Sequence, residues 1–219
     1  MLRSYFQCFG YDSRMSYIRQ TPRYRSRSFV QGFLKLHFLA LENGNTSISI
    51  TDVDGAGQNV SGASSASPGY LLRATSPGRG GCNFYNGQSN SASSEAADST
   101  ELGIVIGTGT TAVAPTDFGL ATLVADGITS GTMEYFPSSG SGLTISAPTG
   151  SFTLERLFRN SSGATITINE VGVFAGMYAS TAGIQGMHGF CVIRDIVSPG
   201  FSVLNGEYAR VIYTISVTA

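Results

Sequence analysis

Apolar residues recur with a period of two along several short segments in the second half of the chain. In residues 151–159, for example, Phe152, Leu154 and Phe158 lie an even number of positions apart. Successive side chains of a β-strand point to opposite faces, so this period indicates strands with one buried face. The same reasoning predicts strands at residues 102–106, 133–136, 143–145, 151–159, 164–174, 190–197 and 208–218.

Turn-forming residues separate these segments, as in Asn160-Ser161-Ser162-Gly163 and in Asn205-Gly206. Short strands at a spacing of roughly ten residues with turn signals between them are typical of sandwiches and barrels. No stretch has a convincing helical period, although residues 92–100 and 116–124 could each form a helical turn. We therefore predict an all-β fold, an antiparallel β-sandwich of the jelly-roll or immunoglobulin-like kind.

Residues 33–53 have the pattern of a β-hairpin. Leu34, Leu36 and Phe38 share one face of an extended segment, and Ile48 and Ile50 share one face of a second. Asn43-Gly44, which lies between the two segments, is a strong short-range hairpin signal.

The composition changes in residues 55–100, where 29 of the 46 residues are Gly, Ala, Ser or Asn. Residues 70–72 and 83–85 offer two short strands, and the remainder has turn chemistry. Loops of this length are unusual inside a compact domain. The segment is either mobile or ordered by a neighbouring subunit, and its small residues favour the second interpretation.

The N-terminal residues interleave arginine with tyrosine and phenylalanine and have no steady period. Thr21-Pro22 disfavours a helix there. We predict an extended basic and aromatic arm over residues 1–28, followed by a sandwich domain over residues 29–219. Tyrosine and arginine commonly anchor protein interfaces. The residues expected to bind a partner are Tyr17, Arg19, Arg23, Tyr24, Arg25 and Arg27.

The charge distribution supports this division. Residues 1–41 contain seven basic residues and one acidic residue, a net charge of +6, whereas residues 42–219 have a net charge of −7. We therefore expect the arm to bind an acidic partner surface. The whole chain carries a net charge of only −1, which gives no bulk attraction to nucleic acid or to anionic membranes.

Composition narrows the class of protein further. Charged residues make up 12% of the chain, about half the usual share. No run of ~18 apolar residues could span a membrane. The three cysteines, Cys8, Cys82 and Cys191, are too few and too scattered for a disulfide framework or a metal site. Synthesis in a reducing cytoplasm is expected.

Two motifs resemble ligand sites but lack essential parts. Residues 107–112 fit the loose G-x-G-x-x-A pattern of dinucleotide folds, but Pro115 prevents the helix that this site needs. Asp52 and Asp54 before Gly55 resemble the start of a calcium loop, but Ala63 stands where the bidentate glutamate would be. We interpret both as turns and predict neither a cofactor nor a metal.

Catalytic candidates are few. His37 and His188 lie far apart in sequence, and Cys191 lies in an apolar run typical of a buried, inert thiol. Glu170 and Arg194 each interrupt an apolar strand, and charges in such places need partners. We predict that Glu170 and Arg194 meet across adjacent strands as a structural ion pair, and that the protein has no catalytic residues.

Three motifs occur in order along residues 102–219. The first is Gly-Ile-Val-Ile-Gly-Thr-Gly-Thr-Thr at 103–111 with Ala114-Pro115-Thr116-Asp117-Phe118 after it. The second is Asn-Ser-Ser-Gly-Ala-Thr-Ile-Thr-Ile-Asn-Glu-Val-Gly-Val-Phe at 160–174. The third joins Arg194-Asp195, Asn205-Gly206 and the strand that ends the chain. In this order they resemble a widespread group of tailed-bacteriophage virion proteins, although Val173 stands where leucine is expected.

The resemblance covers about half of the chain and implies a non-enzymatic, β-rich structural subunit of a phage particle. We expect a capsid decoration or cement protein, or a neck or tail component, located in the virion after synthesis in the host cytoplasm. The partners expected are the major capsid, portal, neck or tail proteins and further copies of the chain in a homo-oligomer. Direct roles at nucleic acid or membranes are not expected.

Two other functions remain open. One is a receptor- or carbohydrate-binding module at the phage tail, for which Tyr85, Tyr135 and Tyr178 are the loose candidates. The other is a virion-borne glycoside hydrolase, which would need two carboxylates about 5–10 Å apart in a cleft.

Overall fold

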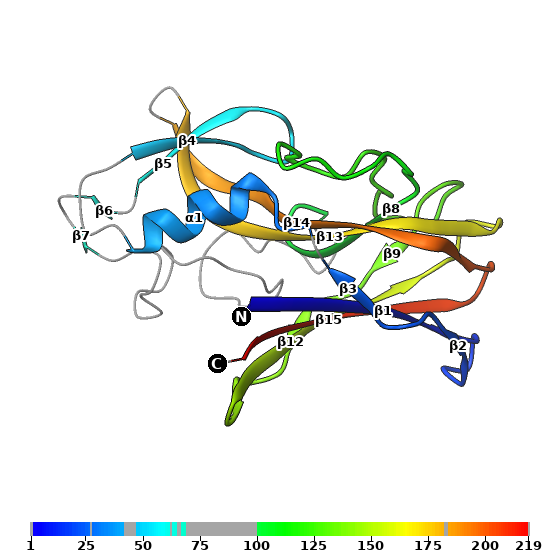
Figure 1. Ribbon diagram of the computed structural model, residues 1–219. Coiled ribbons are helices and arrows are strands. Elements are labelled where there is room, and N and C mark those ends of the chain that lie inside the picture. The colour runs from blue at the N-terminus through cyan, green and yellow to red at the C-terminus, as the bar shows by residue number, and fades with distance from the viewer. Residues whose placement is uncertain are drawn as a thin grey trace.

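The computed structural model describes residues 2–26, 28–41, 47–61, 63–64, 67–68, 100–181 and 184–218. The protein is an all-β sandwich of two antiparallel sheets (Figure 1). The elements are β1 (Leu2–Tyr11), β2 (Tyr17–Gln20), β3 (Tyr24–Ser26), α1 (Gln31–Leu41), β4 (Ser47–Thr51), β5 (Gly57–Ser61), β6 (Ala63–Ser64), β7 (Ser67–Pro68), β8 (Gly103–Gly107), β9 (Glu134–Tyr135), β10 (Ser139–Gly140), β11 (Thr144–Ser146), β12 (Thr149–Arg159), β13 (Ile166–Thr181), β14 (Ile184–Val203) and β15 (Tyr208–Thr218).

The larger sheet, sheet A, has the order β10-β12-β15-β1-β2, with β9 and β11 also paired to β12 and β3 paired to β1. The smaller sheet, sheet B, has the order β14-β13-β5-β4, with β8 also paired to β13. A separate two-stranded ribbon joins β6 and β7. Figure 1 shows sheet A below sheet B, with the loop between β8 and β9 above sheet B.

The strands predicted in the second half of the chain are confirmed, because β8, β9 and β11–β15 occupy those segments. The core lies between the sheets and includes Phe6, Leu154 and Tyr213 from sheet A and Val173 and Ile193 from sheet B. The turns at 160–163 and 205–206 are also confirmed, and Gly163 and Gly206 adopt positive φ values of 83° and 85° in them. Residues 116–124 form no helical turn, and residues 92–100 lie almost wholly outside the described part.

The separate N-terminal arm is not confirmed, because residues 2–26 form β1, β2 and β3 of sheet A. β1 pairs with β15 over its whole length, from Leu2 opposite Val217 to Tyr11 opposite Tyr208. Ser4, Phe6 and Cys8 are buried at alternate positions, while the residues between them are partly exposed. The alternation typical of a strand is therefore present in 2–11, although aromatic residues on both faces hide it.

Residues 28–30 close part of the sandwich edge. Phe29 bridges Ile193, the Val30 N–H donates to the Val192 carbonyl at 3.2 Å, and the Arg194 N–H donates to the Ser28 carbonyl at 3.2 Å. This short segment covers the middle of the β14 edge before the chain enters α1.

The predicted hairpin over 33–53 is wrong in its first half, because residues 31–41 form α1. Leucine, lysine and alanine favour helix, and the segment contains no β-branched residue. In the helix Leu36 is buried, whereas Leu34 and Phe38 are 67% and 51% exposed. β4 pairs instead with β5, and Asn43-Gly44 lies outside the described residues.

Candidate functional site

A buried group of charges joins sheet B to the loop between β8 and β9. Arg194 Nε lies 2.9 Å from Glu170 Oε2, and Arg194 Nη1 lies 2.6 Å from Asp117 Oδ2. Arg194 Nη2 donates to the Thr111 carbonyl at 2.9 Å. The Arg194 side chain is 2% exposed and that of Glu170 is fully buried. The predicted ion pair between Glu170 and Arg194 is therefore confirmed, and Asp117 is a third member that the sequence analysis missed.

Glu170 also binds the backbone of the loop between β8 and β9. Its carboxylate accepts N–H hydrogen bonds from Gly109 at 3.1 Å, Ala121 at 3.0 Å and Thr122 at 2.8 Å. A Cβ added at Gly107 would lie 2.6 Å from both Glu170 Oε1 and the Thr122 carbonyl oxygen, so glycine is needed there. The glycine-rich segment after β8 is not the turn predicted from the sequence, because it runs antiparallel beside residues 122–124, and Gly107 and Gly109 make room for the Glu170 carboxylate.

Burial and hydrogen bonding have opposite effects on the charge of Arg194. Burial alone would lower the pKa of Arg194, but the bonds to Asp117 and Glu170 outweigh it and raise the pKa. The guanidinium therefore stays charged between two carboxylates. Glu170 and Arg194 are shielded from solvent, and their hydrogen bonds fix the loop on sheet B.

The residues of the second and third motifs meet at the turns. Asn160 Nδ2 donates to the carbonyls of Ala164 and Val203, each at 2.8 Å. The Gly206 N–H donates to the Asn160 carbonyl at 2.6 Å. The turn from β12 to β13 is thereby tied to the turn from β14 to β15. Asn160 of the second motif therefore helps to fix the turn of the third motif.

Asp52 and His188 form a second polar contact. His188 Nδ1 lies 3.1 Å from Asp52 Oδ2, and Gln58 Nε2 donates to the same oxygen at 2.7 Å. Asp52 Oδ1 accepts the Ala56 N–H at 2.8 Å, so this carboxylate organises the turn between β4 and β5. The turn predicted for Asp52–Gly55 is confirmed. Among the described residues no group of three or more His, Cys, Asp or Glu could hold a metal ion.

The remaining candidates for reactive side chains are Cys8, Cys191 and His37. Cys8 is fully buried, and burial raises the pKa of its thiol to about 12. Cys191 is 2% exposed, and burial also raises the pKa of its thiol, so the prediction of a buried thiol is confirmed. His37 lies in α1 and not on a strand, and its side chain lies outside the described part.

The residues predicted to bind a partner do not form one group, because they lie at different positions of sheet A. Tyr24 points inward, where its ring lies 5.1 Å from that of Phe6. Arg19 lies at the end of the sandwich, where its Nη2 is 2.5 Å from Glu207 Oε2. Tyr17 is 55% exposed, and Arg27 lies outside the described residues.

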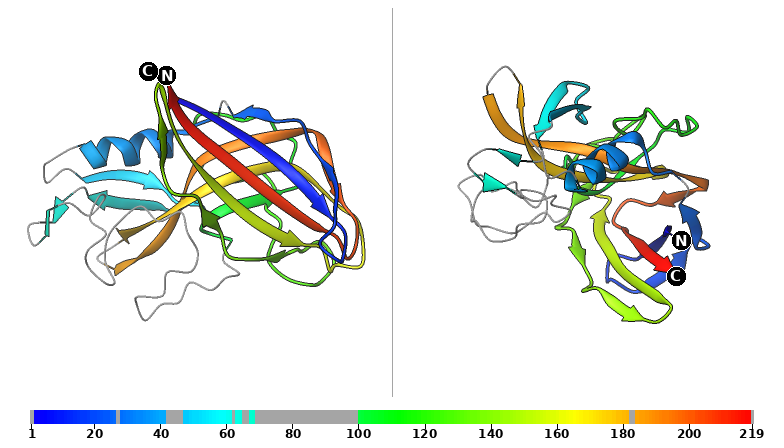
Figure 2. Two further views of the ribbon diagram at one scale, coloured as in Figure 1. Left: turned by 90° about the horizontal axis from the view of Figure 1, so that it is seen from below. Right: turned by 60° about the vertical axis from the view of Figure 1, so that its left-hand side comes forward.

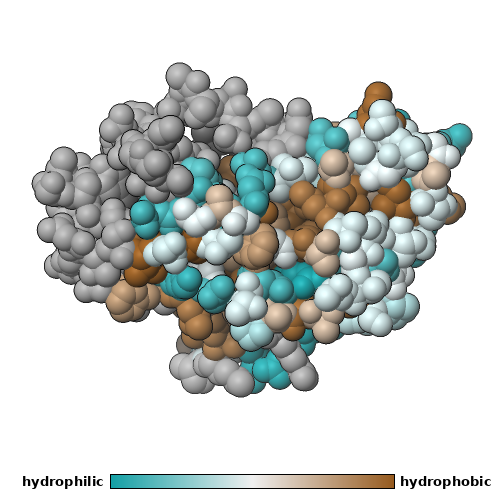
Figure 3. All heavy atoms as spheres, turned by 90° about the horizontal axis from the view of Figure 1, so that it is seen from above, coloured by the Kyte–Doolittle hydropathy of each residue, from teal (hydrophilic) through white to brown (hydrophobic). Residues whose placement is uncertain are grey.

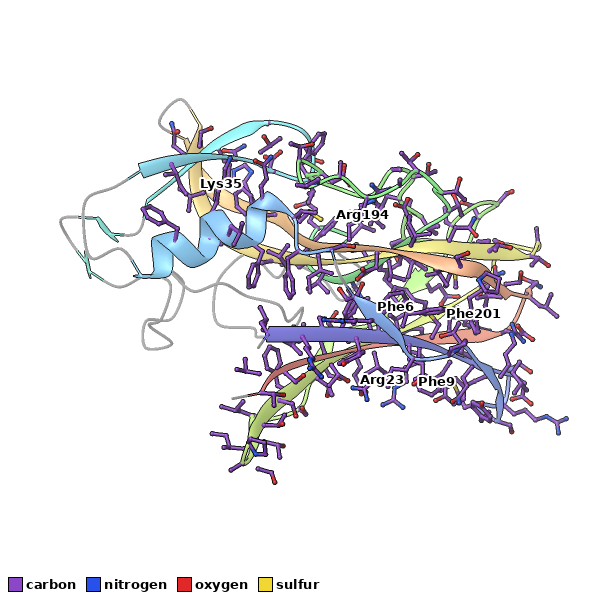
Figure 4. All side chains as sticks on the ribbon, in the orientation of Figure 1. Phe6, Phe9, Arg23, Lys35, Arg194 and Phe201 are labelled. Atoms are coloured by element: carbon purple, nitrogen blue, oxygen red, sulfur yellow. The ribbon has the colours of Figure 1, made fainter. Side chains whose placement is uncertain are left out.

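Arg23 and Arg25 lie on the side of sheet A that faces away from sheet B, which we call the outer face. Figure 2 shows β12, β15 and β1 crossing the front of the view from below, with sheet B behind them. Figure 4 shows Phe9 and Arg23 on this lower side, and Phe6 between the sheets. Along each strand, the residues that alternate with the buried ones belong to the outer face, and their register partners on neighbouring strands share that face. The outer face consists of Arg3, Tyr5, Gln7, Phe9, Tyr11, Arg23, Arg25, Glu155, Leu157, Arg159, Tyr208, Arg210, Ile212 and Thr214.

The positions of Arg3, Tyr5 and Phe9 on the outer face were not predicted from the sequence. The signal for them was their odd-numbered spacing in 3–11, which marks the face opposite Phe6 and Cys8. The outer face combines aromatic rings with guanidinium groups, and Arg159 lies over the Tyr208 ring at 5.7 Å. Such a composition is typical of protein interfaces.

The opposite side of the molecule is formed by sheet B and the loop above it. Figure 3 shows apolar atoms gathered on this side. The exposed large apolar residues of the loop are Phe118, Leu123 and Ile128, at 45%, 40% and 66% exposure. This side therefore carries exposed apolar side chains on the loop, whereas the outer face of sheet A carries aromatic rings and arginines.

Tyr135, a candidate for the carbohydrate-binding alternative, is buried and not exposed. Its hydroxyl donates to the Val124 carbonyl at 2.6 Å, and its ring packs edge-on against Phe158. The side chains of Tyr85 and Tyr178 lie outside the described part. No described helix is long and apolar enough to cross a membrane.

No protein-family model, no curated protein and no solved structure matches the chain.

Proposed function

We propose that the protein is a structural subunit of a tailed-bacteriophage virion that binds neighbouring subunits through the outer face of sheet A. The observation that carries this proposal is the outer face itself, a surface across β1, β3, β12 and β15 rich in arginine and aromatic residues. Such residues anchor interfaces because they combine large contact areas with directed hydrogen bonds.

The resemblance of the three motifs to those of phage virion proteins supports the proposal from a second direction. Their polar residues build the buried charge group and the linked turns.

The proposed role is non-enzymatic and needs no cofactor. The chain would act as a capsid decoration or cement protein, or as a neck or tail component, in contact with the major capsid, portal, neck or tail proteins. A homo-oligomer suits this role because most soluble oligomers are homo-oligomers with closed symmetry.

The test is to purify particles of the phage that encodes the chain, identify their proteins by mass spectrometry and locate the chain by cryo-electron microscopy. We expect the chain in the particle with the outer face of sheet A against another subunit. Density over the capsid lattice would indicate a decoration or cement role, and density at the tail vertex a neck or tail role. Absence from purified particles would overturn the proposal.

One observation favours the alternative of a carbohydrate-binding module. Tyr17 is 55% exposed, and its ring meets the Tyr11 ring edge-on at 6.1 Å at one end of sheet A. Exposed rings of this kind can stack on sugars. Binding of the isolated protein to a glycan array, lost in Tyr17→Ala but retained in Tyr5→Ala, would support this alternative.

A further inference from the structure

Three arginines surround one aromatic ring on the outer face of sheet A. Arg25 lies directly opposite Tyr5 in the pairing of β1 with β3. The Arg23 guanidinium carbon lies 4.4 Å from the centre of the Tyr5 ring. Arg3 precedes Tyr5 by two positions on β1 and therefore projects from the same face. We call Arg3, Arg23 and Arg25 the arginine cluster.

The positive charge of the cluster is not neutralised by the described residues. Among them, no carboxylate forms an ion pair with Arg3, Arg23 or Arg25. The two other arginines of the outer face do have partners: Arg210 pairs with Glu155, and Arg159 lies 3.7 Å from Glu134. Positive charge is thus concentrated at the β3 side of the sheet.

The guanidinium of Arg23 is also preorganised. Stacking on Tyr5 occupies the flat face of the group and leaves its N–H edges free to donate. A fixed guanidinium loses less conformational entropy on binding than a free one. All three side chains are exposed and so can reach a partner.

We propose that the arginine cluster binds carboxylates on an acidic surface of a neighbouring protein subunit. This inference rests on the proposed function and adds the chemistry of the partner. Guanidinium groups bind carboxylates by paired hydrogen bonds. Phe9, Leu157 and Ile212 lie on the same face and supply the apolar contacts that a protein interface needs.

A nucleic-acid partner fits these observations less well. A phosphate backbone needs a continuous basic track. The positive charge is instead confined to one side of the sheet, and the Glu155 side chain, 33% exposed, lies on the same face. The net charge of the chain, −1, also gives no long-range attraction to a polyanion.

The first experiment measures binding of three probes to the full chain: a fluorescent twelve-residue oligoglutamate, a twelve-nucleotide oligo(dT), and inorganic phosphate as competitor. We expect the oligoglutamate to bind most tightly and its affinity to fall at least tenfold in the Arg23→Ala/Arg25→Ala double variant. Arg14→Ala is the matched control, because Arg14 is an exposed arginine in the turn between β1 and β2. Its affinity should stay within twofold of the unsubstituted protein.

Arg23→Lys separates charge from geometry. Lysine keeps the charge but not the flat group that stacks on Tyr5. We expect an affinity between those of the unsubstituted protein and Arg23→Ala. Thermal unfolding of each variant should match the unsubstituted protein, since the replaced side chains are exposed.

Three results would overturn the proposal. Equal oligoglutamate affinity in Arg23→Ala/Arg25→Ala and Arg14→Ala would remove the cluster as the site. Tighter binding of oligo(dT) than of oligoglutamate would assign the cluster to nucleic acid. Complete displacement of oligoglutamate by phosphate at equal concentration would assign it to a small anion.

Incorporation into particles distinguishes this proposal from the proposed function. If the unsubstituted chain is found in particles and the double variant is incorporated equally, the cluster proposal fails and the proposed function stands. If the unsubstituted chain is absent from particles, the proposed function fails, while the probe measurements still decide what the cluster binds.

Discussion

At the scale of single residues, Glu170 connects β13 to Arg194 and to the loop between β8 and β9. Its buried carboxylate accepts three backbone N–H bonds and one from Arg194. The sequence predicted the pair, because a charge within an apolar strand needs a partner. It did not predict the loop that Glu170 holds, because the loop residues have no regular pattern of their own.

Replacing Glu170 by Gln removes one charge and leaves Arg194 buried with Asp117 as its remaining acidic partner. Breaking a buried pair in this way costs about 3–5 kcal/mol of unfolding free energy. Urea unfolding measures the loss. Glu155→Gln is the matched control, since the pair of Glu155 with Arg210 lies at the surface. Surface pairs contribute only about 0–1 kcal/mol. Equal losses in the two variants would contradict the structural role of Glu170.

Glu207 gives a prediction for pH dependence. Its hydrogen bond to Arg19 lowers the pKa of the carboxyl below its ordinary value of 4.5. A lowered pKa in the folded state stabilises the protein fully above pH 4.5, and this contribution is lost as the pH falls through the folded pKa. We expect the free energy of unfolding to fall less steeply below pH 4.5 in Glu207→Gln than in the unsubstituted protein. If the unfolding free energy, measured with urea at each pH, fell equally in the two proteins under acid conditions, this prediction would be contradicted.

At the scale of elements, the sequence predicted strands well where one face is apolar and the other polar, as in β12 and β15. It failed for α1, because Leu34, Leu36 and Phe38 fit a strand face as well as a helix. The signal for the helix was the absence of β-branched residues in 31–41, and in the helix Leu36 is buried. It also could not reveal the outer face of sheet A as a surface, because that depends on which side of β1 another sheet covers.

The packing of the end of β8 against β13 and the loop can be tested at Gly107. A Cβ there would lie 2.6 Å from Glu170 Oε1 and from the Thr122 carbonyl, and the backbone oxygen cannot move away easily. We expect Gly107→Ala to lose about 2 kcal/mol or more of unfolding free energy, as overpacking does. Gly142→Ala is the control, because nothing lies within 4 Å of its added Cβ. If the Gly107→Ala protein were as stable as Gly142→Ala, the end of β8 would be loosely packed.

At the scale of the whole molecule, β1 occupies an interior position in sheet A. It lies between β15 on one side and β2 and β3 on the other. The N-terminal residues therefore belong to the folded body, and only their outward side chains are available to partners.

Removal of residues 1–28 distinguishes this arrangement from a detachable arm. We expect the truncated chain to lose cooperative thermal unfolding, because β15 would lose one of its two neighbours over ten residue pairs and Phe6 and Cys8 would leave the core. Differential scanning calorimetry of the full and truncated chains measures this. A truncated chain with the full-length Tm would restore the interpretation of these residues as an arm.

Because β1 pairs with β15, sheet A can be completed only after the ribosome has synthesised β15. Leu2 pairs with Val217, so about 200 residues of synthesis separate the two strands. At ~5–20 residues per second, β1 waits for about 10–40 s with one edge unpaired. An unpaired strand edge with aromatic side chains is a site for aggregation. Translation products that stop before residue 208 should therefore be the species most in need of chaperones.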